Sequence, residues 1–196
     1  MKEGFLSYWY SLWTDIPLWF YEAGASILCI VVVLSISIWG FLRCSKYGLA
    51  VLLVEYVLLI YGSTVFFRTA SKTVAYNLMP FWSYQAYLDG REPNALIENF
   101  MNVVVFVPVG VMLGCMMNGT LLKSRKGWKI ALLVGIGLSI GIEVLQFVFK
   151  KGFSEIDDVI HNTIGCLLGY VIWLIVLEIW NFSTNWCRLH WGRGKS

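Results

Sequence analysis

Charged residues are scarce in this sequence. Only 14% of its 196 positions are Asp, Glu, Lys or Arg, whereas 58% are hydrophobic, and the mean hydropathy is +0.68. A soluble domain of this length needs a far more polar surface. The net charge is only +3, so the chain lacks the basic footprint of a nucleic-acid-binding protein. The composition therefore predicts an integral membrane protein with no nucleic-acid partner.

Motifs of common hydrolases and metal sites are also missing. The chain has two histidines and no Ser-His-Asp or HExxH arrangement, which leaves little nucleophilic or zinc chemistry. Its five cysteines form no metal-binding spacing, and we interpret them as small apolar packing residues. We therefore expect no metal and no cofactor. No Pro/Ser-rich linker divides the chain, which indicates one domain.

The sequence contains several long apolar runs. Each crossing of the hydrocarbon needs about 20 residues, and such runs must be helical because an open strand would leave its backbone groups unpaired in lipid. We predict an all-α integral membrane bundle of about five transmembrane helices. The predicted spans are 23–42, 48–67, 101–117, 128–149 and 159–180.

The first 22 residues differ from the rest because they are dense in aromatics and poor in aliphatics. This composition favours the membrane interface over its core, with a poorly ordered tail as the alternative. No apolar h-region with a small-residue cleavage site is visible, so we expect no removable signal peptide. The predicted organisation is an interfacial segment at 1–22, a transmembrane domain at 23–180 and a basic tail at 181–196.

The distribution of Lys and Arg among the loops predicts the orientation. Nine of the 15 lie in the loops after the first and third spans and in the C-terminal tail, against six on the other side. Basic loops favour the cytoplasm. We therefore predict a multi-pass membrane protein with an outside N-terminus and a cytoplasmic C-terminus.

With this topology, polar side chains from four helix ends converge at the outer surface. Glu143 and Gln146 share a helix face, and a carboxylate at that depth needs a partner, for which Arg68 is the expected counter-ion. The candidate catalytic residues are Glu143, Asp157 and Asp158. The predicted ligand-binding residues are Arg68, Asn77, Asn99, Asn102, Glu143, Gln146, Glu155, Asp157, Asp158 and Asn162.

Several of these residues have a plainer interpretation that stays open. Asp157 or Asp158 could simply cap the last span and complement its dipole. Asn102 and Asn162 could be interhelical hydrogen-bonding residues. His161 is interpreted as an ordinary interfacial histidine rather than a ligand.

Small residues at a spacing of four indicate a compact bundle, because they let helices approach closely. We expect the third, fourth and fifth spans to pack together with the polar cluster at their mouth. The pairs are Gly110 and Gly114, Gly137 and Gly141, and Gly165 and Gly169.

Several blocks resemble the VanZ-like family of bacterial membrane proteins. They are Arg68, the run 77–81 (NLMPF), Asn99, the run 102–110 (NVVVFVPVG), the run 143–146 (EVLQ), the run 155–165 (EIDDVIHNTIG) and the pair 169–170 (GY). The resemblance covers roughly residues 48 to 178. Lys150 and Lys151 stand where many relatives have an arginine, which would bind a phosphate better than lysine.

The resemblance implies a protein that lowers susceptibility to teicoplanin-type glycopeptides. The expected mode is binding of a membrane lipid or a lipid-tailed glycopeptide at the outer leaflet through the acidic and amide cluster. The alternative is a membrane enzyme acting on a lipid-linked cell-wall precursor by carboxylate acid/base or Mg²⁺-assisted chemistry. A transporter is disfavoured because two matching halves are absent. The ligand, any reaction, the oligomeric state and a housekeeping envelope role stay open.

Overall fold

The structure, a computed structural model, describes residues 46–66, 68, 70–73, 75–117 and 126–191, with side chains from Gly48 to Ser183 within these ranges. The predicted interfacial segment and the predicted first span, 23–42, lie outside the described residues. In the described part the fold is all-α apart from two three-residue strands.

Four stretches of the described chain are long and apolar enough to cross a membrane, and they confirm the second to fifth predicted spans. They are Gly48–Phe66, Ala95–Met116, Gly127–Phe149 and Ile156–Ser183. The helices that carry them are α3 (Lys46–Tyr61) with the π-helix η1 (Gly62–Phe66), α5 (Ala95–Met116), α6 (Gly127–Phe149) and α7 (Ile156–Trp191). α5 begins before the predicted residue 101, because the segment with Glu98 and Asn99 continues the helix beyond the apolar run.

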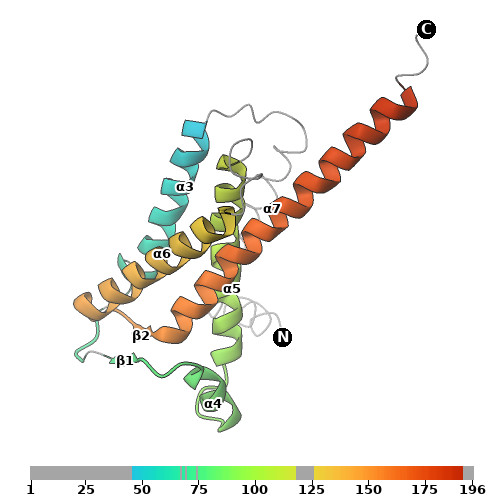
Figure 1. Cartoon of the computed structure of the whole chain (residues 1–196). Helices are drawn as coiled ribbons and strands as arrows, with labels where there is room; N and C mark the ends of the chain where they lie inside the picture. The colour runs from blue at the N-terminus through green and yellow to red at the C-terminus, as the bar shows by residue number, and fades with distance from the viewer. Residues whose placement is uncertain (1–45, 67, 69, 74, 118–125, 192–196) are drawn as a thin grey trace, which may run out of the picture.

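Helix α5 lies at the centre of the bundle, where it packs against α7 at backbone distance (Figure 1). A Cβ atom built on Gly165 would lie 2.1 Å from the Val103 carbonyl oxygen, and one on Gly169 would lie 2.0 Å from that of Val107. The predicted role of these glycines in close packing is confirmed. Gly137 behaves differently, since a Cβ there meets nothing within 4 Å.

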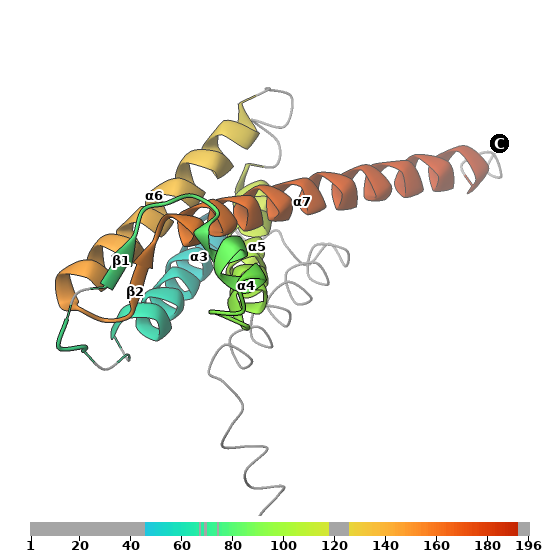
Figure 2. The same cartoon turned by 90° about the horizontal axis from the view of Figure 1, so that it is seen from below.

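One end of the bundle is closed by two short strands and a short helix. Strand β1 (Ala75–Asn77) pairs in parallel with β2 (Phe153–Glu155), in the register Ala75 to Phe153. The short helix α4 (Trp82–Leu88) follows β1. Figure 2 shows β1 and β2 side by side at this end, with α4 near the beginning of α7. We call it the site end, because the polar residues of η1, α5, α6 and α7 meet there.

Candidate functional site

Three cavities open around one group of carboxylates at the site end. The polar pocket has a volume of about 440 Å³ and is lined by Trp82, Ser83, Glu92, Ala95, Glu98, Asn99, Phe153, Glu155 and Asp158. The apolar groove has a volume of about 410 Å³ and is lined by Tyr76, Leu78, Ile140, Glu143, Val144, Phe147, Ser154, Glu155, Ile156 and Val159. The inner chamber holds about 40 Å³ between Ile60, Thr64, Arg68, Asn102, Val105, Phe106, Ile142, Glu143, Gln146, Asp158 and Asn162.

Three carboxylates, Glu143, Glu155 and Asp158, connect these cavities, and we call them the acidic trio. Asp158 lines the polar pocket and the inner chamber, and Glu143 lines the apolar groove and the inner chamber. Glu155 lines the polar pocket and the apolar groove. Each acid therefore stands between two of the three spaces. A molecule that extended from one cavity into the next would pass a carboxylate.

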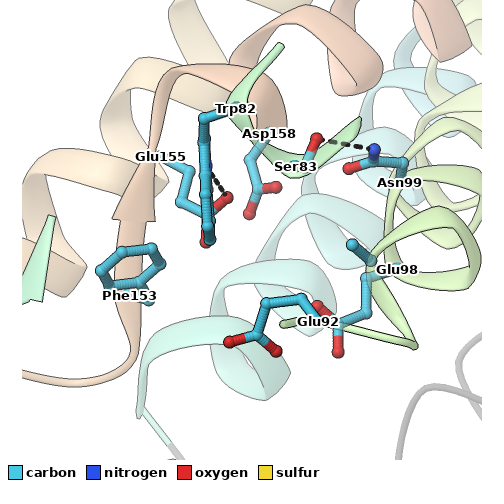
Figure 3. A pocket seen from close by; sticks show the side chains of 9 residues that line it. Trp82, Ser83, Glu92, Glu98, Asn99, Phe153, Glu155 and Asp158 are labelled. Carbon is cyan, nitrogen blue, oxygen red and sulfur yellow. Dashed lines mark hydrogen bonds between the residues drawn. The ribbon is translucent and has the colours of Figure 1, made fainter. Parts of the chain in front are cut away.

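Backbone and side-chain hydrogen bonds hold the acidic trio in place. The backbone N–H of Glu155 donates to Oε2 of Glu143 at 2.8 Å, and the indole N–H of Trp82 donates to Oε2 of Glu155, also at 2.8 Å. The amide of Asn102 on α5 donates to Oδ1 of Asp158 on α7 at 2.7 Å. Figure 3 shows Asp158, Glu155 and Trp82 facing the polar pocket, with Glu92 and Glu98 across it.

Glu155 lies just outside the spanning helices, and its surroundings favour the protonated form. Burial raises the pKa of Glu155 from its ordinary 4.5 to about 8, with help from the charges of Asp158, Asp157 and Glu98, against the opposing hydrogen bond from Trp82. Such a group exchanges a proton near neutral pH, so it is able to serve as an acid or a base.

Asp157 has a different environment from its neighbour Asp158. Its side chain is 0% exposed and accepts hydrogen bonds from the backbone N–H of Phe81 at 2.5 Å and from the backbone N–H and hydroxyl of Ser83 at 3.0 and 2.5 Å. Asn99 completes this network by donating to the Ser83 hydroxyl at 2.9 Å. Asp157 lines none of the three cavities. Its carboxylate thus anchors the start of α4 over the site end.

His161 and Asn162 also have protein partners. The Nδ1 atom of His161 lies 2.6 Å from the backbone oxygen of Asp157, and its Nε2 lies 2.8 Å from the Tyr84 hydroxyl. A carbonyl only accepts, so Nδ1 carries a proton there. The Asn162 amide donates to the Ser139 hydroxyl at 2.8 Å and so links α7 to α6. These contacts fit the structural interpretations given to both residues, although Asn162 also lines the inner chamber.

Of the other predicted amides, Asn77 makes a local structural contact, whereas Gln146 also lines a cavity. Asn77 accepts a hydrogen bond from the backbone N–H of Met79 at 2.9 Å and so shapes the turn after β1. Gln146 donates to the Thr64 carbonyl at 3.1 Å and lines the inner chamber.

Arg68 also lines the inner chamber, but it does not pair with Glu143 as the sequence predicted. In the described part of the chain, the ion pair within 4.0 Å joins Arg91 and Asp89. Arg68 and Glu143 line the same chamber, but their charged atoms are more than 4.0 Å apart. The expected counter-ion contact is therefore absent among the described residues.

Two acceptor atoms of the inner chamber lack a hydrogen-bond partner. They are Oε1 of Glu143 and Oε1 of Gln146, on residues that are only 6% and 4% exposed. Buried acceptors without partners among the described residues are uncommon and costly. No group of three or more His, Cys, Asp or Glu side chains able to hold a metal occurs among the described residues.

Sequence reasoning missed several residues of these cavities. Glu92 and Glu98 line the polar pocket together with Trp82 and Phe153, while Phe147 lines the apolar groove. The run 77–81 was a visible signal for the segment before α4. Nothing in the spacing of Glu92 or Glu98 could have revealed that they face residues from β2 and α7, because tertiary contacts bring them together.

Comparisons with known proteins identify the family of this chain. The family model described as VanZ/LLP1 matches residues 48–177, which hold all the site residues described above. This chain belongs to the VanZ/LLP1 family. Protein VanZ of Enterococcus faecium is 29% identical over 98 residues, which span 48% of this chain and 57% of that protein. No solved structure matches. The sequence-based recognition is thereby confirmed, and the chain is a multi-pass membrane protein of the VanZ/LLP1 family.

Proposed function

We propose that this protein binds a membrane lipid or a lipid-tailed glycopeptide at the outer leaflet and so lowers susceptibility to teicoplanin-type antibiotics. One observation carries the proposal: an apolar groove adjoins two polar cavities through Glu143 and Glu155. An amphiphile has the same division, with an apolar tail joined to a polar head. The outer leaflet follows from the distribution of Lys and Arg among the loops.

The groove is suited to an acyl chain. Its apolar lining includes exposed side chains on α6, such as Val144 and Phe147, which are 52% and 45% exposed. Each methylene removed from water contributes about 0.8 kcal/mol, so a tail of moderate length supplies most of the affinity for a soluble amphiphile. A glycopeptide without a tail lacks this contribution. The protein should therefore act on teicoplanin and leave vancomycin unaffected.

The test is the inhibitory concentration of both drugs in a susceptible Gram-positive host. The strains carry an empty vector, the wild type, Val144→Trp, which fills the groove, or Leu133→Trp, an equally bulky control on an exposed position of α6 outside the groove. We expect Val144→Trp to lose protection against teicoplanin by about fourfold or more, at matched membrane levels. Protection by Val144→Trp equal to that by Leu133→Trp would overturn the proposal.

A second candidate is an enzyme acting on a lipid-linked cell-wall precursor. It is favoured by the inner chamber, where two carboxylates and the guanidinium of Arg68 line one small space. Glu143 or Asp158 would then move a proton while Arg68 holds an anionic group. Mass spectrometry of the lipid-linked precursors distinguishes the two candidates. Cells with wild type and cells with Glu143→Gln should differ in precursor composition if the protein is an enzyme, and should match if it only binds.

A further inference from the structure

Two loops that are far apart in the sequence meet at the site end. The backbone N–H of Ser71, in the loop after η1, donates to the backbone carbonyl of Lys150, directly after α6, at 2.7 Å. The Lys151 ammonium donates to the backbone carbonyl of Phe66, at the end of η1, at 2.8 Å. Figure 1 shows both loops at the same end of the bundle, beside β1. These contacts bring the basic residues of the two loops into one region.

Gly152 lets the guanidinium of Arg68 lie against the turn after α6. The φ angle of Gly152 is +99°, a conformation that favours glycine. A Cβ atom built there would lie 2.8 Å from Nη1 of Arg68, so a larger residue would push the guanidinium away. We call the resulting group of cations the basic collar. Its members are Arg68, Lys72, Lys150 and Lys151.

The basic collar carries positive charge without an acid beside it. The segments 66–73 and 147–153 contain its four cations and neither Asp nor Glu. In the part of the chain that the structure describes, no carboxylate oxygen lies within 4.0 Å of a collar nitrogen. All members except Lys151 are exposed, and Lys151 uses one of its three N–H donors on the Phe66 carbonyl. The collar therefore offers charge and hydrogen-bond donors to an anion.

The position of the basic collar favours an anion that belongs to a lipid. Its three lysines line none of the three cavities, so they lie outside the acidic trio. Phe147, which lines the apolar groove, precedes Lys150 by about one helical turn. In the predicted orientation the collar lies at the outer surface, where the preference of cations for cytoplasmic loops does not account for it. Cations at a membrane surface attract anionic lipid heads.

We propose that the basic collar binds the phosphate of an anionic membrane lipid whose acyl chain lies in the apolar groove. This proposal rests on the proposed function, and it selects the membrane lipid over the glycopeptide as the ligand. The fork of N–H donors on Arg68 matches two phosphate oxygens, and Lys150 adds a point charge. A zwitterionic head carries its own positive group, which opposes the attraction. Inorganic phosphate has the charge but no tail for the groove.

The experiment compares phospholipids with identical acyl chains. Phosphatidic acid, phosphatidylglycerol and phosphatidylcholine are titrated into the full chain in nonionic detergent micelles, and bound lipid is measured by native mass spectrometry. We expect both anionic lipids to bind about tenfold more tightly than phosphatidylcholine. A second arm adds inorganic phosphate in excess over phosphatidylglycerol. Retained phosphatidylglycerol supports a lipid site, whereas its displacement by inorganic phosphate would overturn the proposal.

Charge-removing variants locate the binding of the phosphate. Arg68→Gln and Lys150→Gln should each reduce the preference for phosphatidylglycerol over phosphatidylcholine to about threefold or less, with phosphatidylcholine binding retained as the sign of an intact fold. Lys126→Gln is the control, because it removes an exposed cation at the beginning of α6, the end opposite the collar. A preference that survives both collar variants, or that Lys126→Gln lowers as strongly, overturns the proposal.

The outcomes also separate this proposal from the proposed function. If the three lipids bind equally and Val144→Trp weakens all of them, the groove binds tails and only the collar assignment fails. If no phospholipid binds but Val144→Trp still lowers protection against teicoplanin, the groove takes the glycopeptide and again only the collar assignment fails. If no phospholipid binds and Val144→Trp protects as well as Leu133→Trp, both fail.

Discussion

The backbone N–H of Glu155 donates to Oε2 of Glu143 at 2.8 Å, and the other oxygen of the same carboxylate has no partner. The Ser154 hydroxyl donates to the backbone carbonyl of Glu143 at 3.1 Å, so two residues of β2 are hydrogen-bonded to Glu143 on α6. The contact orients Glu143 between the apolar groove and the inner chamber. One oxygen is held in position by the fold, and the second has no hydrogen-bond partner among the described residues.

Glu143→Ala should destabilise the protein by about 1–3 kcal/mol, because the partly buried N–H of Glu155 loses its acceptor. Glu143→Gln keeps an acceptor oxygen at the same place and should cost less than about 1 kcal/mol. The measurement is the unfolding midpoint in mixed micelles with increasing denaturing detergent. Glu178→Ala is the control for loss of a glutamate outside the site. Equal midpoints for Glu143→Ala and the wild type would show that the hydrogen bond contributes nothing.

Asp157→Asn should loosen α4 without removing a residue of the three cavities. The carboxylate accepts three hydrogen bonds from Phe81 and Ser83, and an amide nitrogen facing those donors replaces attraction with repulsion. We expect a loss of about 2–4 kcal/mol. Hydrogen exchange at the backbone amides of Phe81 and Ser83 measures the effect locally. Unchanged protection of both amides in Asp157→Asn would contradict the anchoring role.

Gly169→Ala should weaken the contact between α5 and α7, whereas Gly137→Ala should be tolerated. A methyl on Gly169 would lie 2.0 Å from the backbone oxygen of Val107, but one on Gly137 meets nothing within 4 Å. Gly169→Ala should lower the free energy of unfolding by about 1–3 kcal/mol. Gly137→Ala should raise it by up to about 1 kcal/mol, because alanine has the higher helix propensity. Thermal unfolding of the two variants in detergent tests the difference. Equal melting temperatures would contradict the described packing.

The stability of the protein should depend on pH through Glu155. Its pKa in the folded protein is raised to about 8 from an ordinary 4.5, mainly by burial. The folded state therefore holds a proton that the unfolded state releases, so stability is highest at low pH and falls as the pH rises between these two values. The melting temperature of the wild type should fall more steeply than that of Glu155→Gln between about pH 5 and about pH 9. Parallel slopes would show that Glu155 keeps an ordinary pKa.

The sequence by itself determined the class of protein and most of its spans. A low content of charge and apolar runs of membrane-spanning length allow few structures other than helices, because lipid offers no partners to an unpaired backbone. The glycine pairs likewise predicted that the third, fourth and fifth spans pack together, and the structure places Gly165 and Gly169 of α7 against the backbone of α5. The blocks from Arg68 to Tyr170 pointed to the family that the comparisons confirm.

Only the tertiary structure decided how the polar residues divide their roles. Asp157 and Asp158 are neighbours in the chain, yet a helix turns by about 100° per residue, so one side chain anchors α4 and the other faces the cavities. The pairing of β1 with β2 joins segments separated by two spans, and no local pattern encodes such a contact. Among the described residues, only the structure shows that Arg68 does not pair with Glu143 and that two oxygens of the inner chamber have no partner.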